Sequence, residues 1–182
     1  VLPSFINKDC LVFLISYSGN TEETLSNMYR ALKRGAMVIA ITSNGAIARI
    51  CHQLKIPFVR IPEGYQPRAA LPYLVIPIFP LLEKMKILNG SFKQNVYSAS
   101  TILKGLANEI SIDTPLERNI CKKVALNIKD SIPLIYSYRF LEPVAYRMKC
   151  QLNENSKVMA FCHTIPEMNH NEIVGCLNAN RY

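Results

Sequence analysis

The chain has 182 residues, of which 49% are hydrophobic, so it can bury a substantial core and is not a disordered protein. Its 21 Lys and Arg residues exceed its 13 Asp and Glu residues, which gives a formal net charge of +8 at pH 7. These charges are scattered, without a long basic run or a zinc-finger or recognition-helix signature, so we expect no nucleic acid partner. A phosphorylated small molecule is an adequate anionic partner.

Cysteine usage and the apolar runs narrow the class further. None of the six cysteines has a CxxC partner, and Cys10 and Cys162 lie in apolar runs, where a free thiol behaves as a small hydrophobe. We therefore expect a reducing, cytoplasmic environment, no disulfide framework and no metal site. The longest apolar run, Leu71–Leu82, is shorter than the ~20 residues that span a bilayer. Three prolines interrupt it, so we expect a buried, kinked helix and no membrane partner.

The first part of the chain alternates predicted strands and helices. Uninterrupted apolar runs predict buried strands at Leu11–Ile15, Met37–Thr42 and Ile56–Ile61. Apolar residues at helical spacing predict helices between them, over Leu25–Leu32 and Ala46–Leu54. This order favours a parallel α/β sheet, in which ligands bind beyond the carboxyl ends of the strands.

The first strand runs into the first helix through the sequence SYSGNT, which we call the serine turn (residues 16–21). The first N–H groups of a helix lack internal partners and carry the positive end of the helix dipole. A glycine lets the backbone approach a ligand, and the hydroxyls of Ser16, Ser18 and Thr21 add neutral donors. The serine turn is therefore suited to a phosphate dianion. The same pattern also fits an ordinary helix N-terminus, with Asn20 and Glu23 as a capping box.

The middle of the chain is predicted to be helical. Residues 89–97 are polar and are typical of a connection, and helices are expected over residues 99–110 and 116–128. The strand–helix pattern then restarts. The expected elements are a strand at Ile132–Tyr136, a helix at Leu141–Asn153, a strand at Lys157–Cys162 and a helix that opens at His170, with Asn169 and Glu172 as a capping box. This order indicates a second α/β unit of the same type.

Four stretches of the chain together resemble one family. SYSGNTEETL at residues 16–25 resembles the phosphate-binding turn of sugar isomerase (SIS) domains. GYQPRAALPYL at 64–74, NENSK at 153–157 and PEMNHNEIVG at 166–175 follow it, as in the archaeal and bacterial bifunctional phosphoglucose/phosphomannose isomerases. The resemblance covers nearly the whole chain.

The resemblance implies an α/β fold with two SIS-type units, each a parallel sheet flanked by helices in a flavodoxin-like, three-layer arrangement. We expect the first unit at residues 1–90, a helical connection at 91–130 and the second unit at 131–182. The chain begins without Met just before a strand and ends soon after a helix starts. We therefore expect both units to be incomplete, the first without its opening strand and the second without its C-terminal part.

The resemblance also implies a reaction and a site. In the family, the hydroxyls of Ser16, Ser18 and Thr21 bind the sugar phosphate. Arg68 stabilises the reaction intermediate. Glu154 is the base, and His170 reaches the sugar ring from the other subunit of a homodimer and serves ring opening. The implied activity interconverts glucose 6-phosphate and mannose 6-phosphate with fructose 6-phosphate by a cis-enediolate proton transfer, which needs no metal and no redox cofactor.

Other interpretations remain open. One is a non-catalytic SIS module that binds a sugar phosphate, as in some transcription regulators, although no DNA-binding helix-turn-helix is found in the sequence. Another is a different SIS-domain sugar-phosphate isomerase, and a third is a fragment without activity of its own. The chain departs from the family at Met148, where a Trp is usual, and at Ser137, where a Gly is often found.

Overall fold

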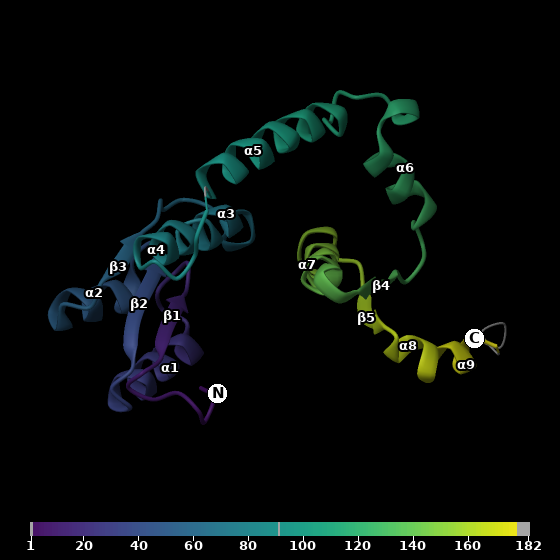
Figure 1. Ribbon diagram of the computed structural model, residues 1–182. Coiled ribbons are helices and arrows are strands. Elements are labelled where there is room, and N and C mark those ends of the chain that lie inside the picture. Colours follow the sequence, from purple (N-terminus) through teal and green to yellow (C-terminus); the bar gives the residue numbers. More distant parts are fainter. Residues whose placement is uncertain (1, 91, 178–182) are drawn as a thin grey trace. The chain divides into compact units, whose positions relative to one another are not determined.

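The computed structural model describes residues 2–90 and 92–177 of the chain. They form two compact units, Val1–Tyr97 and Ser98–Tyr182, and the boundary falls inside helix α5 (Phe92–Glu109). Each unit contains a parallel sheet with helices packed on it (Figure 1). The predicted α/β class is confirmed.

The sheet of the first unit has three strands in the order β1-β2-β3, all parallel. The strands are β1 (Leu11–Ile15), β2 (Met37–Thr42) and β3 (Phe58–Arg60). Helix α1 (Glu22–Lys33) joins β1 to β2, and α2 (Gly45–Leu54) joins β2 to β3. Because all three strands run in the same direction, their carboxyl ends lie at one edge of the sheet.

The hydrophobic core of the first unit lies between this sheet and its two helices. Along β2, side chains alternate, so Val38 and Ala40 face the core, and Ile41 faces the opposite side. All three are buried, which explains why β2 reads as a continuous apolar run. Burial also raises the pKa of the Cys51 thiol on α2, so this cysteine acts as a small core hydrophobe.

The apolar run after β3 differs from its prediction. It forms a 3₁₀ turn, η1 (Pro67–Ala69), and two short helices, α3 (Leu71–Val75) and α4 (Ile78–Lys84), instead of one kinked helix. No residue of α3 or α4 is buried, so the prediction of a buried helix is wrong. The break falls at Pro77, whose missing N–H and ring do not allow the first helix to continue. No helix among the described residues is long and apolar enough to cross a membrane.

The helix α5 begins at Phe92, inside the stretch that was expected to be a polar connection. Polar residues do not prevent a helix where Gly and Pro are absent, and neither occurs between residues 92 and 104. After α5, the second unit continues with η2 (Leu116–Arg118) and α6 (Ile120–Asn127). The carboxamide of Asn119 caps α6 by accepting a hydrogen bond from the N–H of Lys122 at 3.1 Å.

The sheet of the second unit pairs two parallel strands, β4 (Leu134–Tyr138) and β5 (Phe161–Ile165). Helix α7 (Glu142–Gln151) lies between them in sequence and packs on both. Short 3₁₀ and π turns flank it at η3 (Arg139–Leu141) and η4 (Leu152–Ser156). Both strands begin and end later than predicted, so that β4 includes residues 137 and 138, beyond its predicted end at Tyr136.

Two short helices, α8 (Glu167–His170) and α9 (Glu172–Cys176), follow β5. His170 ends α8 and does not open a helix, so the predicted capping box of Asn169 and Glu172 is wrong. The carboxylate of Glu172 instead accepts a hydrogen bond from the hydroxyl of Tyr136 on β4 at 2.9 Å. A contact across the fold has replaced a local one.

Candidate functional site

The serine turn lies at the carboxyl end of β1, where the chain enters α1. Ser16 extends the strand ladder, because its N–H donates to the carbonyl of Ile41 at 3.1 Å. Its hydroxyl oxygen lies 2.8 Å from that of Thr21 and accepts the N–H of Gly19 at 3.1 Å. The hydroxyl of Ser18 accepts the N–H of Asn20 at 3.2 Å. Ser16 is buried, whereas Ser18 and Thr21, which precede the first residue of α1, are exposed.

The N-terminus of α1 is not closed by a side-chain cap. Thr21 is the N-cap residue, and its side chain makes no capping hydrogen bond. The alternative interpretation as a capping box is wrong, because the carboxamide oxygen of Asn20 accepts the N–H of Ala46, in α2, at 2.9 Å. The amides of the first turn therefore keep their capacity for an anionic acceptor. Glu22 and Glu23 occupy the same turn, and both are exposed to solvent.

Two glycines allow the serine turn to contact the loop after β2. Gly19 has φ +67°, and a Cβ there would lie 1.9 Å from the carbonyl oxygen of Asn44. Gly45 has φ +84°, and a Cβ there would lie 2.2 Å from the carbonyl oxygen of Ser18. The carbonyl of Gly19 also accepts the N–H of Ile47 at 2.9 Å. The two loops thus pack backbone against backbone, which only glycine permits at these positions.

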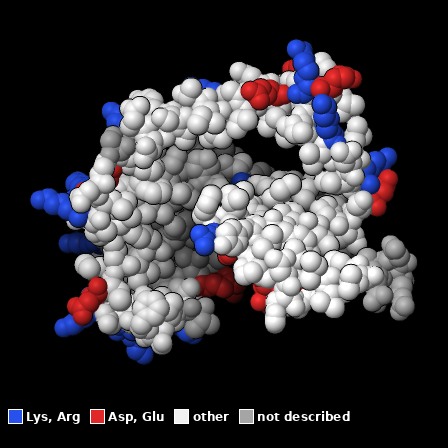
Figure 2. Space-filling view, turned by 45° about the vertical axis from the view of Figure 1, so that its right-hand side comes forward, with Lys and Arg blue, Asp and Glu red and all other residues white. Residues whose placement is uncertain are grey.

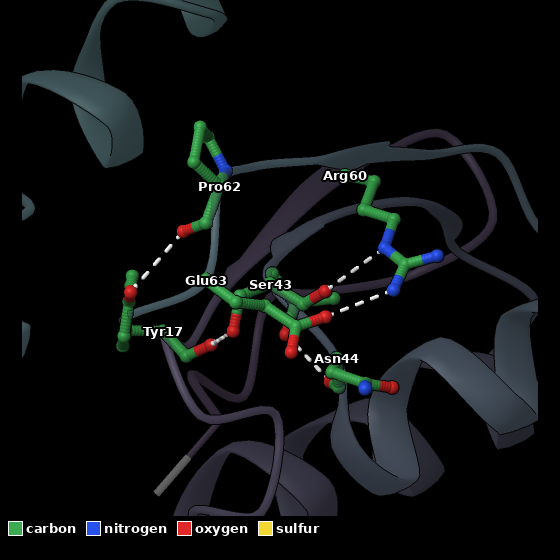
Figure 3. A network of polar contacts seen from close by, with 7 residues as sticks. Tyr17, Ser43, Asn44, Arg60, Pro62 and Glu63 are labelled. Atoms are coloured by element: carbon green, nitrogen blue, oxygen red, sulfur yellow. Dashed lines mark hydrogen bonds and ion pairs between the residues drawn. The ribbon is translucent and has the colours of Figure 1, made fainter. Parts of the chain in front are cut away.

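A second network joins the carboxyl ends of all three strands (Figure 3). The carbonyl of Tyr17 accepts hydrogen bonds from both the N–H and the hydroxyl of Ser43, at 3.0 and 2.6 Å. The guanidinium of Arg60 donates to the carbonyl of Ser43 at 3.3 Å and pairs with Glu63 at 2.8 Å. The hydroxyl of Tyr17 donates to the carbonyl of Pro62 at 3.1 Å. Sequence reasoning missed this network, because its members are far apart in the chain.

Arg68 lies beyond the carboxyl end of β3, on the same sheet edge as the serine turn. It is the middle residue of η1 and is half-buried. Pro67 begins that turn, and a proline at the first position presets the backbone angle of a helical turn. The predicted phosphate-binding residues and Arg68 thus belong to the same unit, and they follow the carboxyl ends of β1 and β3, respectively.

The other two predicted site residues belong to the second unit. Glu154 lies in the π turn η4, is exposed, and its backbone carbonyl accepts the Nζ of Lys157 at 2.7 Å. His170 is the last residue of α8 and is also exposed. Neither side chain is buried within its own unit.

The second unit also contains a polar cluster that sequence reasoning missed. The carboxylate of Glu172 contacts both the hydroxyl of Tyr136 and the Nδ1 of His163, around a hollow of about 220 Å³. The hydrogen bond to Glu172 raises the pKa of Tyr136, and burial and the charge of Glu172 act in the same direction. No sequence signal connects the three residues, because strand register brings Tyr136 beside His163.

The described residues were compared with the requirements of a metal site and of a basic binding surface. No group of three His, Cys, Asp or Glu residues among them is placed to bind a metal ion. On the face drawn in Figure 2, Lys and Arg side chains are interspersed with Asp, Glu and neutral residues, without a continuous basic patch.

Two family descriptions match the chain. Residues 4–67 match the SIS domain, and residues 117–182 match the C-terminal SIS domain of bacterial phospho-glucose isomerase. Among solved structures, one from Bacillus subtilis superposes with a TM-score of 0.68 at 24% identity, over 94% of this chain and 52% of that one. This likeness shows the fold.

Relatives of known name are similar over nearly the whole chain. A bifunctional phosphoglucose/phosphomannose isomerase of Caldicellulosiruptor bescii is 38% identical over 96% of this chain and 52% of its own length. A bifunctional phosphoglucose/phosphomannose isomerase of Aquifex aeolicus is 37% identical over 97% of this chain and 51% of its own length. A D-glucosamine-6-phosphate 4-epimerase of Sulfolobus acidocaldarius is 35% identical over 92% and 51%. The chain spans about half the length of these relatives, and it belongs to the SIS-domain family that includes the bifunctional phosphoglucose/phosphomannose isomerases.

Proposed function

We propose that the chain carries the substrate site of an aldose–ketose isomerase that interconverts glucose 6-phosphate and mannose 6-phosphate with fructose 6-phosphate. The observation that carries this proposal is the serine turn. Its hydroxyls gather at an uncapped helix N-terminus, on the carboxyl edge of a parallel sheet. The named relatives supply the reaction, since those with 38% and 37% identity are phosphoglucose/phosphomannose isomerases.

In the proposed mechanism the serine turn binds the substrate phosphate through Ser16, Ser18 and Thr21. With the phosphate fixed, C1 and C2 of the open-chain sugar reach the catalytic groups. Glu154 takes a proton from one of these carbons and returns it to the other, through a cis-enediolate. The guanidinium of Arg68 stabilises the negative charge that develops on the enediolate oxygens. The reaction is balanced without a metal or redox cofactor, because Glu154 returns the proton that it removes, a hydroxyl proton moves between O1 and O2, and the electron pair of the broken C–H bond stays in the sugar.

His170 is proposed to open the sugar ring by protonating its oxygen, from the second subunit of a homodimer. Its exposure, and that of Glu154, supports a partner that completes the site. Large apolar side chains of the second unit are exposed as well, among them Leu134, Phe140 and Phe161. A protein partner would bury such a surface. We also propose a cytoplasmic location, which the six free cysteines support.

The test is a coupled assay for both aldose phosphates from fructose 6-phosphate, with EDTA present, on the protein as its gene encodes it. We expect both products, and a loss of at least ~10²-fold in kcat for Glu154→Gln, the lower end for a catalytic acid or base. Glu117→Gln is the matched control, because Glu117 is also an exposed carboxylate of the second unit, on η2. Equal kcat in the two variants would contradict the role of Glu154. Tight binding of fructose 6-phosphate without turnover would instead favour a non-catalytic SIS module.

A second candidate function is epimerisation of an amino-sugar phosphate. It is favoured by one observation, the 35% identity to a D-glucosamine-6-phosphate 4-epimerase over 92% of the chain. The serine turn would hold the phosphate in both reactions, whereas the reacting carbon differs. Incubation with glucosamine 6-phosphate, followed by NMR, distinguishes them, because inversion at C4 leaves an aldose and isomerisation produces a ketose.

A further inference from the structure

We propose that Tyr17 is a positioning residue that joins the serine turn to the segment that carries Arg68 (residues 62–70, here called the arginine segment). Tyr17 lies between two of the proposed phosphate ligands, yet its side chain is directed to the loop after β3. The expected effect on catalysis rests on the proposed function. The physical link itself does not.

The hydroxyl of Tyr17 makes two hydrogen bonds, both with the arginine segment. It donates to the carbonyl of Pro62 at 3.1 Å, as Figure 3 shows, and accepts the N–H of Tyr65 at 2.8 Å. A phenol has one O–H to donate, and here the oxygen accepts from a second group. Both partners are backbone atoms, so this link depends on the position of the segment and not on its side chains.

The backbone of Tyr17 is itself held in place. The backbone carbonyl of Tyr17 accepts two hydrogen bonds from Ser43, at the end of β2, and Ser43 is 5% exposed. Ser16, the residue before Tyr17, continues the hydrogen-bond ladder between β1 and β2. The side chain of Tyr17 is therefore half-buried, its backbone is held at the edge of the sheet, and its hydroxyl contacts the loop after β3.

Besides the contact of the Tyr65 side chain with Tyr73, the arginine segment has few other anchors before Arg68. Residues 62–67 are all exposed, and no atom lies within 4 Å of a Cβ built at Gly64. The ion pair of Arg60 with Glu63 is solvent-exposed on both sides, and exposed pairs hold a loop weakly. The next firm anchor is Ala70, which is fully buried.

The turn between these two anchors transmits the constraint to Arg68. The N–H of Ala69 donates to the carbonyl of Gln66 at 2.8 Å, and that of Ala70 donates to Pro67 at 3.2 Å. A turn closed in this way moves as one piece. Because Tyr17 holds the beginning of the arginine segment, it limits where the backbone of Arg68 lies relative to the phosphate ligands, which belong to the same turn as Tyr17. A shift of about 1 Å in a reacting group can lower turnover by up to ~10²-fold.

The test compares Tyr17→Phe with Tyr65→Phe in the protein as its gene encodes it. Tyr17→Phe removes both hydrogen bonds and keeps the ring. Tyr65→Phe keeps the backbone N–H that Tyr17 binds and removes only the hydroxyl, which lies 3.3 Å from that of Tyr73. We expect Tyr17→Phe to lower kcat about tenfold with KM within about twofold, because the phosphate ligands are unchanged and the Arg68 contact to the transition state is weakened. Tyr65→Phe should leave both constants unchanged.

Amide hydrogen exchange measures the link without reference to catalysis. We expect Tyr17→Phe to speed exchange of the amides of Tyr65, Ala69 and Ala70 at least fivefold, with β2 unchanged. Unchanged exchange in the arginine segment would overturn the link, whether or not the wild-type protein is an isomerase. If the wild type is active, and Tyr17→Phe shows faster exchange but the same kcat as the wild type, the positioning role is overturned. If the wild type shows no turnover, the proposed function fails separately, and exchange alone decides on the link.

Discussion

Replacing Gly19 with Ala should be among the most damaging single changes in the first unit. The backbone of Gly19 is left-handed, with φ +67°, and a Cβ there would lie 1.9 Å from the carbonyl oxygen of Asn44 and 2.7 Å from the hydroxyl of Thr42. The first of these contacts is with backbone, which has no rotamer to relieve it. The serine turn and the loop after β2 must therefore separate by about 1 Å or more to restore an ordinary carbon–oxygen contact.

The free energy of unfolding can be followed term by term. A left-handed backbone costs an L-residue about 1–2 kcal/mol. Separation of the loops also weakens the hydrogen bond from the N–H of Ile47 to the carbonyl of Gly19 and that from Ala46 to Asn20, both 2.9 Å long. Each contributes about 1 kcal/mol net. Gly19→Ala should thus lower the free energy of unfolding by about 3–4 kcal/mol.

Gly64→Ala is the matched control, since Gly64 belongs to the same unit and also has a left-handed backbone, with φ +91°, but no atom lies within 4 Å of its Cβ. It should show the conformational term alone, about 1–2 kcal/mol. Urea denaturation followed by far-UV circular dichroism suits both variants, because the chain has no Trp for fluorescence. Equal destabilisation by the two substitutions would refute the argument that close backbone contact between the loops requires Gly19.

Three further changes test other parts of the structure. Gly105→Ala, at an open position in α5, should raise the free energy of unfolding by about 0.5–1 kcal/mol in urea denaturation, because Ala is the better helix former. Asn119 is 1% exposed and caps the N-terminus of α6. Asn119→Ala should therefore lower the free energy of unfolding by about 1–2 kcal/mol in the same assay. The pKa of Tyr136 is raised in the folded protein, so the folded state keeps this proton longer and stability should fall as the pH rises above about 10. Glu172→Gln should shift the tyrosinate absorbance titration of Tyr136 toward lower pH and weaken that fall; an unchanged titration would contradict the assigned cause.

The first two strands of the first unit were predictable because their signals are local. β1 and β2 are continuous apolar runs that match their predicted bounds, Leu11–Ile15 and Met37–Thr42. A strand that ends in hydroxyl residues and leads into a helix also placed Ser16 and Thr21 at the correct edge of the sheet. In the second unit, β4 begins two residues after its predicted start and β5 begins four residues after its own. Both strands are half-exposed and mix apolar residues with Ser, Tyr and His, so their apolar pattern is weaker.

The details that failed depend on contacts between distant residues. Asn20 has the spacing of a capping box, but its carboxamide binds Ala46, 26 positions away. Tyr17 reaches Tyr65 over 48 positions, and Glu172 reaches Tyr136 over 36. A local pattern gives the capacity of a side chain to form a hydrogen bond, whereas the fold decides which partner it meets.

The hydrogen bonds of the serine turn divide its hydroxyls into two kinds. Ser16 is 6% exposed, and its oxygen already accepts the N–H of Gly19, so its own proton is best used toward Thr21, 2.8 Å away. In that arrangement the proton of Thr21 remains available, on an exposed side chain at the N-terminus of α1. Ser18 is exposed too, and its oxygen accepts from Asn20, which leaves its proton for a ligand. We therefore propose that, within the phosphate site, Ser16 acts mainly through the turn that it organises, and that Ser18 and Thr21 present the hydroxyl donors.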